Sequence, residues 1–322
     1  MPGLRAGGKP VPTLRDHALS HILEATSLPL DLVASAPAKV NLTLHVIGRR
    51  ADGYHDIESV VAFADLCDRL SLTPSDELAL TVVGPSAGQT GADAENLVLK
   101  AARALAARVA GIKLGAFRLE KNIPIAAGLG GGSADAAAAL RLLAQTNNLA
   151  TDDPRLVAAA GATGADVPVC LDPRPRLMRG IGDILSAPLP LPRLFAVLAN
   201  PGVALSTKLV FSRWVSSADP ARPLDPAVLA KMQNEEQLLD WLASQPNDLE
   251  APATALAPAV AHVLAALRSL PGCRLARMSG SGATCFALFS SATESAAAAK
   301  ILRADFPQWW IVETTLGGRD SD

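Results

Sequence analysis

The fold of this chain is decided by the stretch PIAAGLGGGSA, which runs from Pro124 to Ala134 and holds four glycines among the five residues Gly128–Gly132. The segment that follows, Ala134–Gln145, is rich in Ala and Leu, and both residue types favour a helix. The segment that precedes the glycines, Ile123–Ile125, predicts a short strand. The predicted order is therefore strand, glycine loop and helix.

A glycine loop in front of a helix favours an anion. Because glycine has no Cβ, several backbone N–H groups can converge on one point. The helix N-terminus adds unpaired donors and the positive end of its macrodipole, and Ser133 can add a hydroxyl. No Lys-Ser or Lys-Thr pair follows the last glycine, and the glycine spacing differs from that of the dinucleotide fingerprint. The sequence predicts a phosphate site of another design, with a turn that serves only close packing as the alternative.

The composition is typical of a folded protein with about two domains of roughly 150 residues each. Of 322 residues, 49% are hydrophobic and 19% are charged, which excludes an intrinsically disordered chain. The net charge of -2 gives no basic excess for nucleic acid or an anionic membrane. The scattered cysteines predict neither a disulfide framework nor a zinc site, so we expect a cytoplasmic protein without nucleic-acid or membrane partners; they are Cys67, Cys170, Cys273 and Cys285.

Residues 1–30 predict an N-terminal extension with one short helical stretch at His17–Ala25. This segment has no apolar core followed by a small-residue cleavage site, and no window of the chain is apolar over the length of a membrane span. A run of prolines between 173 and 192 marks a boundary. We therefore expect one domain over residues 31–190 and a second over 191–322.

Hydrophobic periodicity predicts both strands and helices in each domain. In the first domain we expect strands at Leu32–Ser35, Val40–Ile47, Ile57–Phe63, Asp68–Leu72 and Phe117–Glu120, and helices at Asn96–Ala110 and Pro154–Ala160. In the second we expect strands at Phe195–Ala199, Cys285–Phe289 and Trp309–Thr314, and helices at Ser206–Trp214, Pro226–Met232, Ala255–Ser269 and Thr293–Asp305. Pro37 predicts a break or bulge in the first strand, and Asp52-Gly53 predicts a turn.

Three separated segments resemble the motifs of the GHMP kinase superfamily in order and spacing. They are PAKVNL at Pro37–Leu42, the glycine stretch, and SGSGAT at Ser279–Thr284. Two further segments, RADGYH at Arg50–His55 and GADVP at Gly164–Pro168, resemble those of the superfamily members that act on a cytidylylated alcohol. The resemblance covers about residues 32–315. It implies an α+β, two-domain GHMP kinase fold with an N-terminal ATP-binding domain, a smaller C-terminal α/β sandwich domain, and the active site between them.

The resemblance implies an ATP-dependent kinase whose small-molecule substrate is a cytidine diphosphate-linked methylerythritol. The expected reaction phosphorylates its 2-hydroxyl group in the non-mevalonate route to isopentenyl diphosphate. By resemblance, Asp166 is the general base and Lys39 is the cation beside the reacting hydroxyl, and this suits a poorly nucleophilic alcohol. The alternative for this pair is a structural salt bridge. Two other readings of the chain remain: a homoserine or mevalonate type of kinase, which Gly53–His55 disfavours, and a nucleotide sensor without catalysis.

The remaining site residues are carried over from the same motifs. For ATP, the resemblance implies Asn96, Leu97, Pro124, Gly128, Leu129, Gly130, Gly131, Gly132, Ser133 and Ala134. For the second substrate, it implies Asn41, Tyr54, His55, Thr207, Phe211, Gly280, Ser281 and Gly282. The ring of Tyr54 would stack on cytosine opposite Phe211, for which a core position is the alternative, and His55 would bind the base edge. Phosphoryl transfer also implies Mg²⁺, with Ser133 as its candidate ligand, in a monomer or homodimer.

Overall fold

The computed structural model describes residues 3, 31–89, 96–216, 223–232 and 234–317, and the stretch His17–Ala25 lies outside these residues. Its strands are β1 (Leu32–Asn41), β2 (His45–Arg49), β3 (His55–Pro74), β4 (Ala79–Val83), β5 (Gly115–Glu120), β6 (Arg176–Gly180), β7 (Ile184–Leu185), β8 (Leu194–Asn200), β9 (Leu275–Met278), β10 (Cys285–Phe289) and β11 (Trp310–Gly317). Its helices are a 3-10 turn at Ala87–Gln89 and α1 (Leu97–Ala106), α2 (Gly131–Thr146), α3 (Pro154–Thr163), α4 (Val167–Leu171), α5 (Thr207–Arg213), α6 (Pro226–Ala230), α7 (Glu235–Ser244), α8 (Glu250–Leu256), α9 (Pro258–Arg268) and α10 (Ala292–Asp305).

One sheet runs through both halves of the chain, in the order β4-β5-β3-β11-β8-β10-β9. Strand β3 is its centre, because it pairs with β1, β2, β5, β6 and β11. The two strands expected at Ile57–Phe63 and Asp68–Leu72 are the two ends of this single 20-residue strand. The pairing of β1 with β3 shifts register between Pro37 and Lys39, which confirms the expected bulge. This sheet joins the two parts of the α+β fold, whereas the domain boundary at residue 190 stays a prediction.

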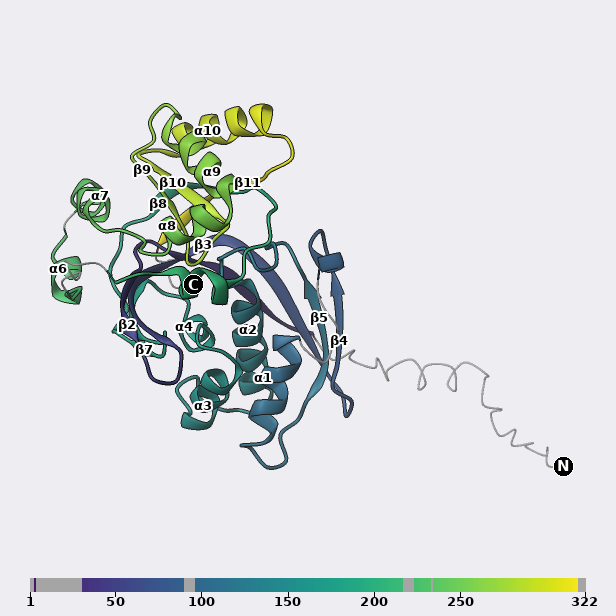
Figure 1. Cartoon of the computed structure of the whole chain (residues 1–322). Coiled ribbons are helices and arrows are strands. Elements are labelled where there is room, and N and C mark those ends of the chain that lie inside the picture. Colours follow the sequence, from purple (N-terminus) through teal and green to yellow (C-terminus); the bar gives the residue numbers. More distant parts are fainter. Residues whose placement is uncertain (1–2, 4–30, 90–95, 217–222, 233, 318–322) are drawn as a thin grey trace.

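Helices cover the two halves of the sheet separately (Figure 1). Helices α1 to α4 gather on the N-terminal half, where the alanines of α2 are buried against β1 and β3. Their small side chains let the helix lie close to the strands. Helices α8, α9 and α10 gather on the C-terminal half with β8 to β11. The glycine loop therefore lies at one end of a buried helix, at the junction of the two halves.

Three expected elements differ from the structure for local reasons. Ile123–Ile125 is not a strand, because Asp68 Oδ1 accepts the backbone N–H groups of Asn122 (2.5 Å) and Ile123 (2.8 Å) in place of a strand partner. Helix α2 begins at Gly131, three residues before the expected start. The helix expected at Ala255–Ser269 is two helices, since Pro258 begins α9 and cannot continue α8.

The strand expected at Val40–Ile47 is also divided, because β1 ends at Asn41 and β2 begins at His45. The Asp52-Gly53 turn is confirmed between β2 and β3, with Gly53 at a φ of +88°. The other expected strands and helices are present with ends that move by a few residues.

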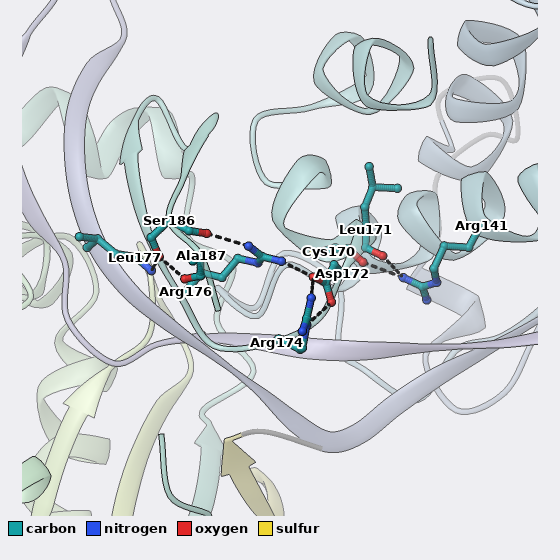
Figure 2. Close-up of polar contacts among 9 residues, drawn as sticks. All are labelled: Arg141, Cys170, Leu171, Asp172, Arg174, Arg176, Leu177, Ser186 and Ala187. Atoms are coloured by element: carbon teal, nitrogen blue, oxygen red, sulfur yellow. Dashed lines mark hydrogen bonds and ion pairs between the residues drawn. The ribbon is translucent and has the colours of Figure 1, made fainter. Parts of the chain in front are cut away.

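Arg141 of α2 fixes the C-terminal end of the short helix α4 (Figure 2). Its guanidinium donates to the carbonyl oxygen of Cys170 at 2.7 Å, and also to that of Ser35 in β1 at 2.5 Å. Just beyond α4, the carboxylate of Asp172 binds the side chains of Arg174 and Arg176. The buried helix α2 thereby holds both the strand β1 and the helix α4 in place.

Candidate active site

A cavity of about 1290 Å³ lies where the glycine loop meets β1, the β2–β3 turn, α4 and α5. Most of the site residues expected from the sequence line it: Lys39, Asn41, Tyr54, His55, Asn96, Leu97, Pro124, Gly128, Gly130, Gly131, Gly132, Ser133, Asp166, Thr207, Phe211, Gly280 and Ser281. Three expected residues do not: the side chains of Leu129 and Ala134 are buried in the core, and Gly282 lies outside the wall. The fold thus gathers residues that are up to 242 positions apart in the chain, from Lys39 to Ser281.

The glycine loop packs so tightly that a side chain at Gly128 has no room. Gly128 has a φ of +75°, and a Cβ there would lie 2.6 Å from the carbonyl oxygen of Ser279 and 2.7 Å from that of Gly282. The hydroxyl of Ser279 donates to the carbonyl oxygen of Gly128 at 2.9 Å. Gly130 also has a left-handed φ, of +61°, and precedes the first turn of α2. Gly131, Gly132 and Ser133 of that turn line the cavity, and the N–H groups at the start of a helix suit a phosphate group.

The loop also adjoins a close pair of opposite charges. Lys39 Nζ lies 2.9 Å from Asp166 Oδ2, and a Cβ at Gly130 would lie 3.2 Å from Lys39 Cε and 4.0 Å from Asp166 Oδ2. The side chain of Lys39 is only 5% exposed, whereas that of Asp166 is 35% exposed. The backbone N–H of Lys39 donates to the carbonyl oxygen of Leu129 at 2.8 Å, which ties the strand to the loop. A phosphate at the loop would therefore meet a lysine and an accessible carboxylate.

Asn41 holds the lysine in place from the opposite side. Its Oδ1 accepts a hydrogen bond from Lys39 Nζ at 3.0 Å, and its Nδ2 donates to Ser59 Oγ at 2.7 Å. Its backbone N–H donates to Ser279 Oγ at 3.1 Å, so the segment Ser279–Thr284 joins the same network. These bonds orient the amide toward Lys39, and a contact between Asn41 and the second substrate stays a prediction.

Aromatic side chains gather where the β2–β3 turn and α5 line the cavity, and this part is called the aromatic end. The rings of His55 and Phe211 lie 5.0 Å apart at 33°, and Trp214 meets His55 edge-on at 5.9 Å. Tyr54 lines the cavity with 58% of its surface exposed. Burial, and then the positive charge of Arg49, lower the pKa of His55 below its ordinary value. A neutral imidazole among exposed aromatic faces suits a nucleobase.

The sequence reasoning missed several residues of the wall. Trp214 is one of them, although its spacing of three from Phe211 is typical of two residues on one helix face. Lys121 and Asp135 are two others, and they join into a buried cluster next to the loop. Lys208 is an exposed cation on α5 at the aromatic end. No sequence pattern singles out Lys121 or Asp135, because their contact depends on the path of the loop between them.

Comparisons with known proteins show to which family the chain is similar. The model of the GHMP kinases N terminal domain matches residues 96–172, and that of the GHMP kinases C terminal domain matches residues 225–308. A 4-diphosphocytidyl-2-C-methyl-D-erythritol kinase of Rhodopseudomonas palustris (strain HaA2) is 56% identical over 285 residues, which are 86% of this chain and 95% of that protein. The kinase of the same name from Xanthobacter autotrophicus is 57% identical over 287 residues, which are 88% of this chain and 98% of that protein.

The chain belongs to the 4-diphosphocytidyl-2-C-methyl-D-erythritol kinase family. A crystal structure of a 4-(cytidine 5'-diphospho)-2C-methyl-D-erythritol kinase is also similar, with 37% identity, a TM-score of 0.71, and coverage of 89% of this chain and 100% of that one. The homoserine kinase of Cytophaga hutchinsonii has a TM-score of 0.66 and 23% identity over 89% of this chain and 95% of its own, and shares the fold alone. Membership in this family makes the chain a kinase with the two-domain GHMP fold.

GHMP kinases use ATP as their co-substrate, and the cradle of glycines is the part of this site that suits its phosphates. Among the described residues, no helix is both long and apolar enough to cross a membrane. The cytoplasmic location and the monomeric or homodimeric state stay predictions.

Proposed function

We propose that this kinase transfers the γ-phosphoryl group of ATP to the 2-hydroxyl group of 4-diphosphocytidyl-2-C-methyl-D-erythritol, in the non-mevalonate route to isopentenyl diphosphate. The observation that carries the proposal is the Lys39–Asp166 pair, which adjoins the glycine loop and lines the same cavity as the aromatic side chains. A triphosphate at the loop and a nucleobase at the aromatic end would bring the two substrates together at this pair.

Asp166 is the group that takes the proton. Its carboxylate is the accessible member of the pair, and an alcohol within hydrogen-bond reach of it can lose its proton as the new bond forms. The oxygen of the alcohol forms a bond to the γ-phosphorus, the bond from that phosphorus to the bridging oxygen breaks, and ADP leaves with the electron pair. Asp166 retains the proton until solvent accepts it.

Lys39 stabilises the charge that develops on the attacking oxygen. Its ammonium is buried and held by both Asp166 and Asn41, so it needs no reorganisation when the reaction begins. Holding the alcohol, the carboxylate and the phosphate in one arrangement removes much of the entropic cost of bringing them together. The two charges lie 2.9 Å apart, and the 35% exposed side chain of Asp166 leaves the pair accessible to an acceptor hydroxyl from the cavity.

The aromatic end selects the cytidine part of the acceptor. Tyr54 presents an exposed ring at the wall, and His55 presents an imidazole whose pKa is lowered by burial. Stacking of a base on an aromatic ring contributes about 1–3 kcal/mol, and a neutral imidazole nitrogen can accept a hydrogen bond from the amino group of cytosine. Phe211 lines the same wall and contacts the His55 ring, with 5.0 Å between the ring centroids.

Magnesium suits the oxygen donors near the loop. Mg²⁺ usually keeps phosphate and water ligands and takes one or two oxygen atoms from the protein. Ser133 in the first turn of α2 lines the cavity and supplies such an oxygen, while the described residues hold no cluster of three or more carboxylate, cysteine or histidine side chains. When bound, the ion neutralises the triphosphate.

An assay of ADP release tests the proposal with three acceptors in parallel: the cytidylylated methylerythritol, homoserine and mevalonate. We expect turnover with the first alone, and phosphorus NMR of the product should show a new phosphomonoester on carbon 2. Comparable turnover of homoserine or mevalonate would remove the cytidine assignment. ATP binding without turnover of any acceptor would favour the sensor reading.

A further inference from the structure

A buried cluster of three charges lies against the glycine loop. Lys121 Nζ binds the carboxylate of Asp68 on β3 and lies 2.7 Å from Oδ2 of Asp135 on α2. The side chains of Lys121, Asp68 and Asp135 are 3%, 0% and 4% exposed. Lys121 precedes the glycine loop and Asp135 follows it, so their ion pair joins the two ends of the loop.

We propose that the Lys121–Asp135 pair, anchored by Asp68, is a positioning clasp that holds the glycine loop in its nucleotide-binding conformation. The proposal rests on the proposed function, because it assigns a role to residues outside the reacting pair in the same site. Lys121 and Asp135 are positioning residues, since they act through the loop that they flank.

The contacts of Lys121 show how the clasp acts on the loop. A Cβ at Gly131 would lie 3.1 Å from Lys121 Nζ, so the ammonium packs directly beneath the first residue of α2. On the other side, Asp68 Oδ1 accepts the N–H groups of Asn122 and Ile123, which fixes the chain just before the loop. Movement of Lys121 would therefore move both the entry to the loop and its glycines.

The stability of the core does not explain why three charged side chains are buried here. Burial raises the pKa of Asp135 even though Lys121 opposes this shift, so its charge is stabilised poorly by the fold itself. Among the described residues, Oδ1 of Asp135 has no hydrogen-bond partner. Apolar side chains of similar size often stabilise a core as well as a buried ion pair does. A costly cluster in the wall of the cavity points to a role in the site.

Three variants test the clasp against a merely structural role. Lys121→Met removes the ammonium at similar length, and Asp135→Asn keeps an oxygen that can accept from Lys121. Arg179→Met is the matched control. Arg179 of β6 pairs with the buried Glu58, which lies on β3 as Asp68 does, but Arg179 does not line the cavity. Calorimetry measures the Kd of a non-hydrolysable ATP analogue, and steady-state kinetics measure KM for each substrate.

We expect Lys121→Met to lower kcat/KM for ATP by about 100-fold, the scale of a misplacement of about 1 Å at a reacting centre. The Kd of the ATP analogue should rise, the KM of the acceptor should stay unchanged, and Asp135→Asn should retain more nucleotide affinity than Lys121→Met. Arg179→Met should lower the melting temperature and leave the Kd of the analogue unchanged.

An unchanged Kd in folded Lys121→Met would overturn the proposal, and so would an equal rise in Kd for Arg179→Met. If Lys121→Met does not fold, Asp135→Asn decides: wild-type affinity and kinetics in that variant would also overturn the clasp. A wild-type protein that does not bind the ATP analogue would refute the proposed function instead, so the two failures are distinguishable.

Discussion

Replacement of Asp166 by Asn tests the reacting pair most directly. An amide has nearly the shape of the carboxylate, and its oxygen can still accept from Lys39 Nζ, which lies 2.9 Å from Asp166 Oδ2. Because Asn41 Oδ1 also accepts from this ammonium, the variant leaves Lys39 Nζ with two hydrogen-bond acceptors. We therefore expect the protein to fold and to bind ATP with nearly wild-type affinity.

The loss of the base should appear in kcat. General-base assistance is worth about 10²- to 10⁴-fold, or roughly 3–6 kcal/mol of transition-state stabilisation at about 1.4 kcal/mol per decade. The alcohol would approach the exposed part of Asp166, whose side chain is 35% exposed. An amide at this position cannot accept the proton of the alcohol, because it is not basic. We expect kcat to fall within this range, measured by coupled ADP release with the cytidylylated substrate.

A carboxylate at the other end of the same helix provides the control. Asp172 lies just beyond α4, pairs with Arg174 and Arg176, and is not part of the cavity wall. Asp172→Asn should leave kcat unchanged, and it should lower stability only modestly where it removes the exposed pair with Arg174. An Asp166→Asn variant that keeps more than half of the wild-type kcat would refute the assignment of the base.

Gly128→Ala should weaken binding of an ATP analogue about 5- to 30-fold, because an alanine at a φ of +75° is strained by about 1–2 kcal/mol. Its Cβ would also lie only 2.6 and 2.7 Å from two backbone carbonyl oxygens. Gly161→Ala, where a Cβ meets nothing within 4 Å, is the matched control in calorimetry, and equal affinities would contradict the cradle. Tyr54→Ala should raise the KM of the cytidylylated acceptor about 5- to 150-fold and leave that of ATP unchanged, and the reverse pattern in steady-state kinetics would misplace the cytidine site. Because the lowered pKa of His55 keeps its imidazole neutral near pH 7, the KM of the acceptor should rise only as the pH falls below the ordinary histidine range. His55→Gln should remove that pH dependence, and a dependence that persists in this variant would assign the titration to another group.

The site could be predicted where its chemistry is carried by contiguous motifs. The glycine run, Lys39 and Asp166 each stand in a short segment whose pattern survives without knowledge of the fold, and the structure brings them into one cavity. The error at Ile123–Ile125 has a different origin. Its two isoleucines favour a strand, but the backbone N–H of Ile123 donates to a carboxylate that lies 55 positions earlier, at Asp68. A local pattern holds no information on such a partner.

The same limit explains the residues that were missed. In the sequence, Lys121 looks like an ordinary surface charge. Its burial depends on two partners that are distant in the chain, Asp68 on β3 and Asp135 on α2. Leu129 and Ala134 were assigned to ATP because they belong to the motif, yet both side chains are buried in the core. A motif therefore predicts which segment forms a wall better than it predicts which side chains face the ligand.

The arrangement of the two proposed catalytic groups, Lys39 and Asp166, follows from one helix. Lys39 lies on β1, whose Ser35 carbonyl oxygen accepts from Arg141, and Asp166 directly precedes α4, whose Cys170 carbonyl oxygen accepts from the same guanidinium. Arg141 is ten residues, or about 15 Å, along α2 from Gly131, where the glycine loop ends. Helix α2 thus presents its N-terminus to the phosphates and, through Arg141, fixes the strand and the helix that carry the lysine and the carboxylate. Because α2 is buried along most of its length, the distance between the phosphate cradle and the reacting pair is set by the core.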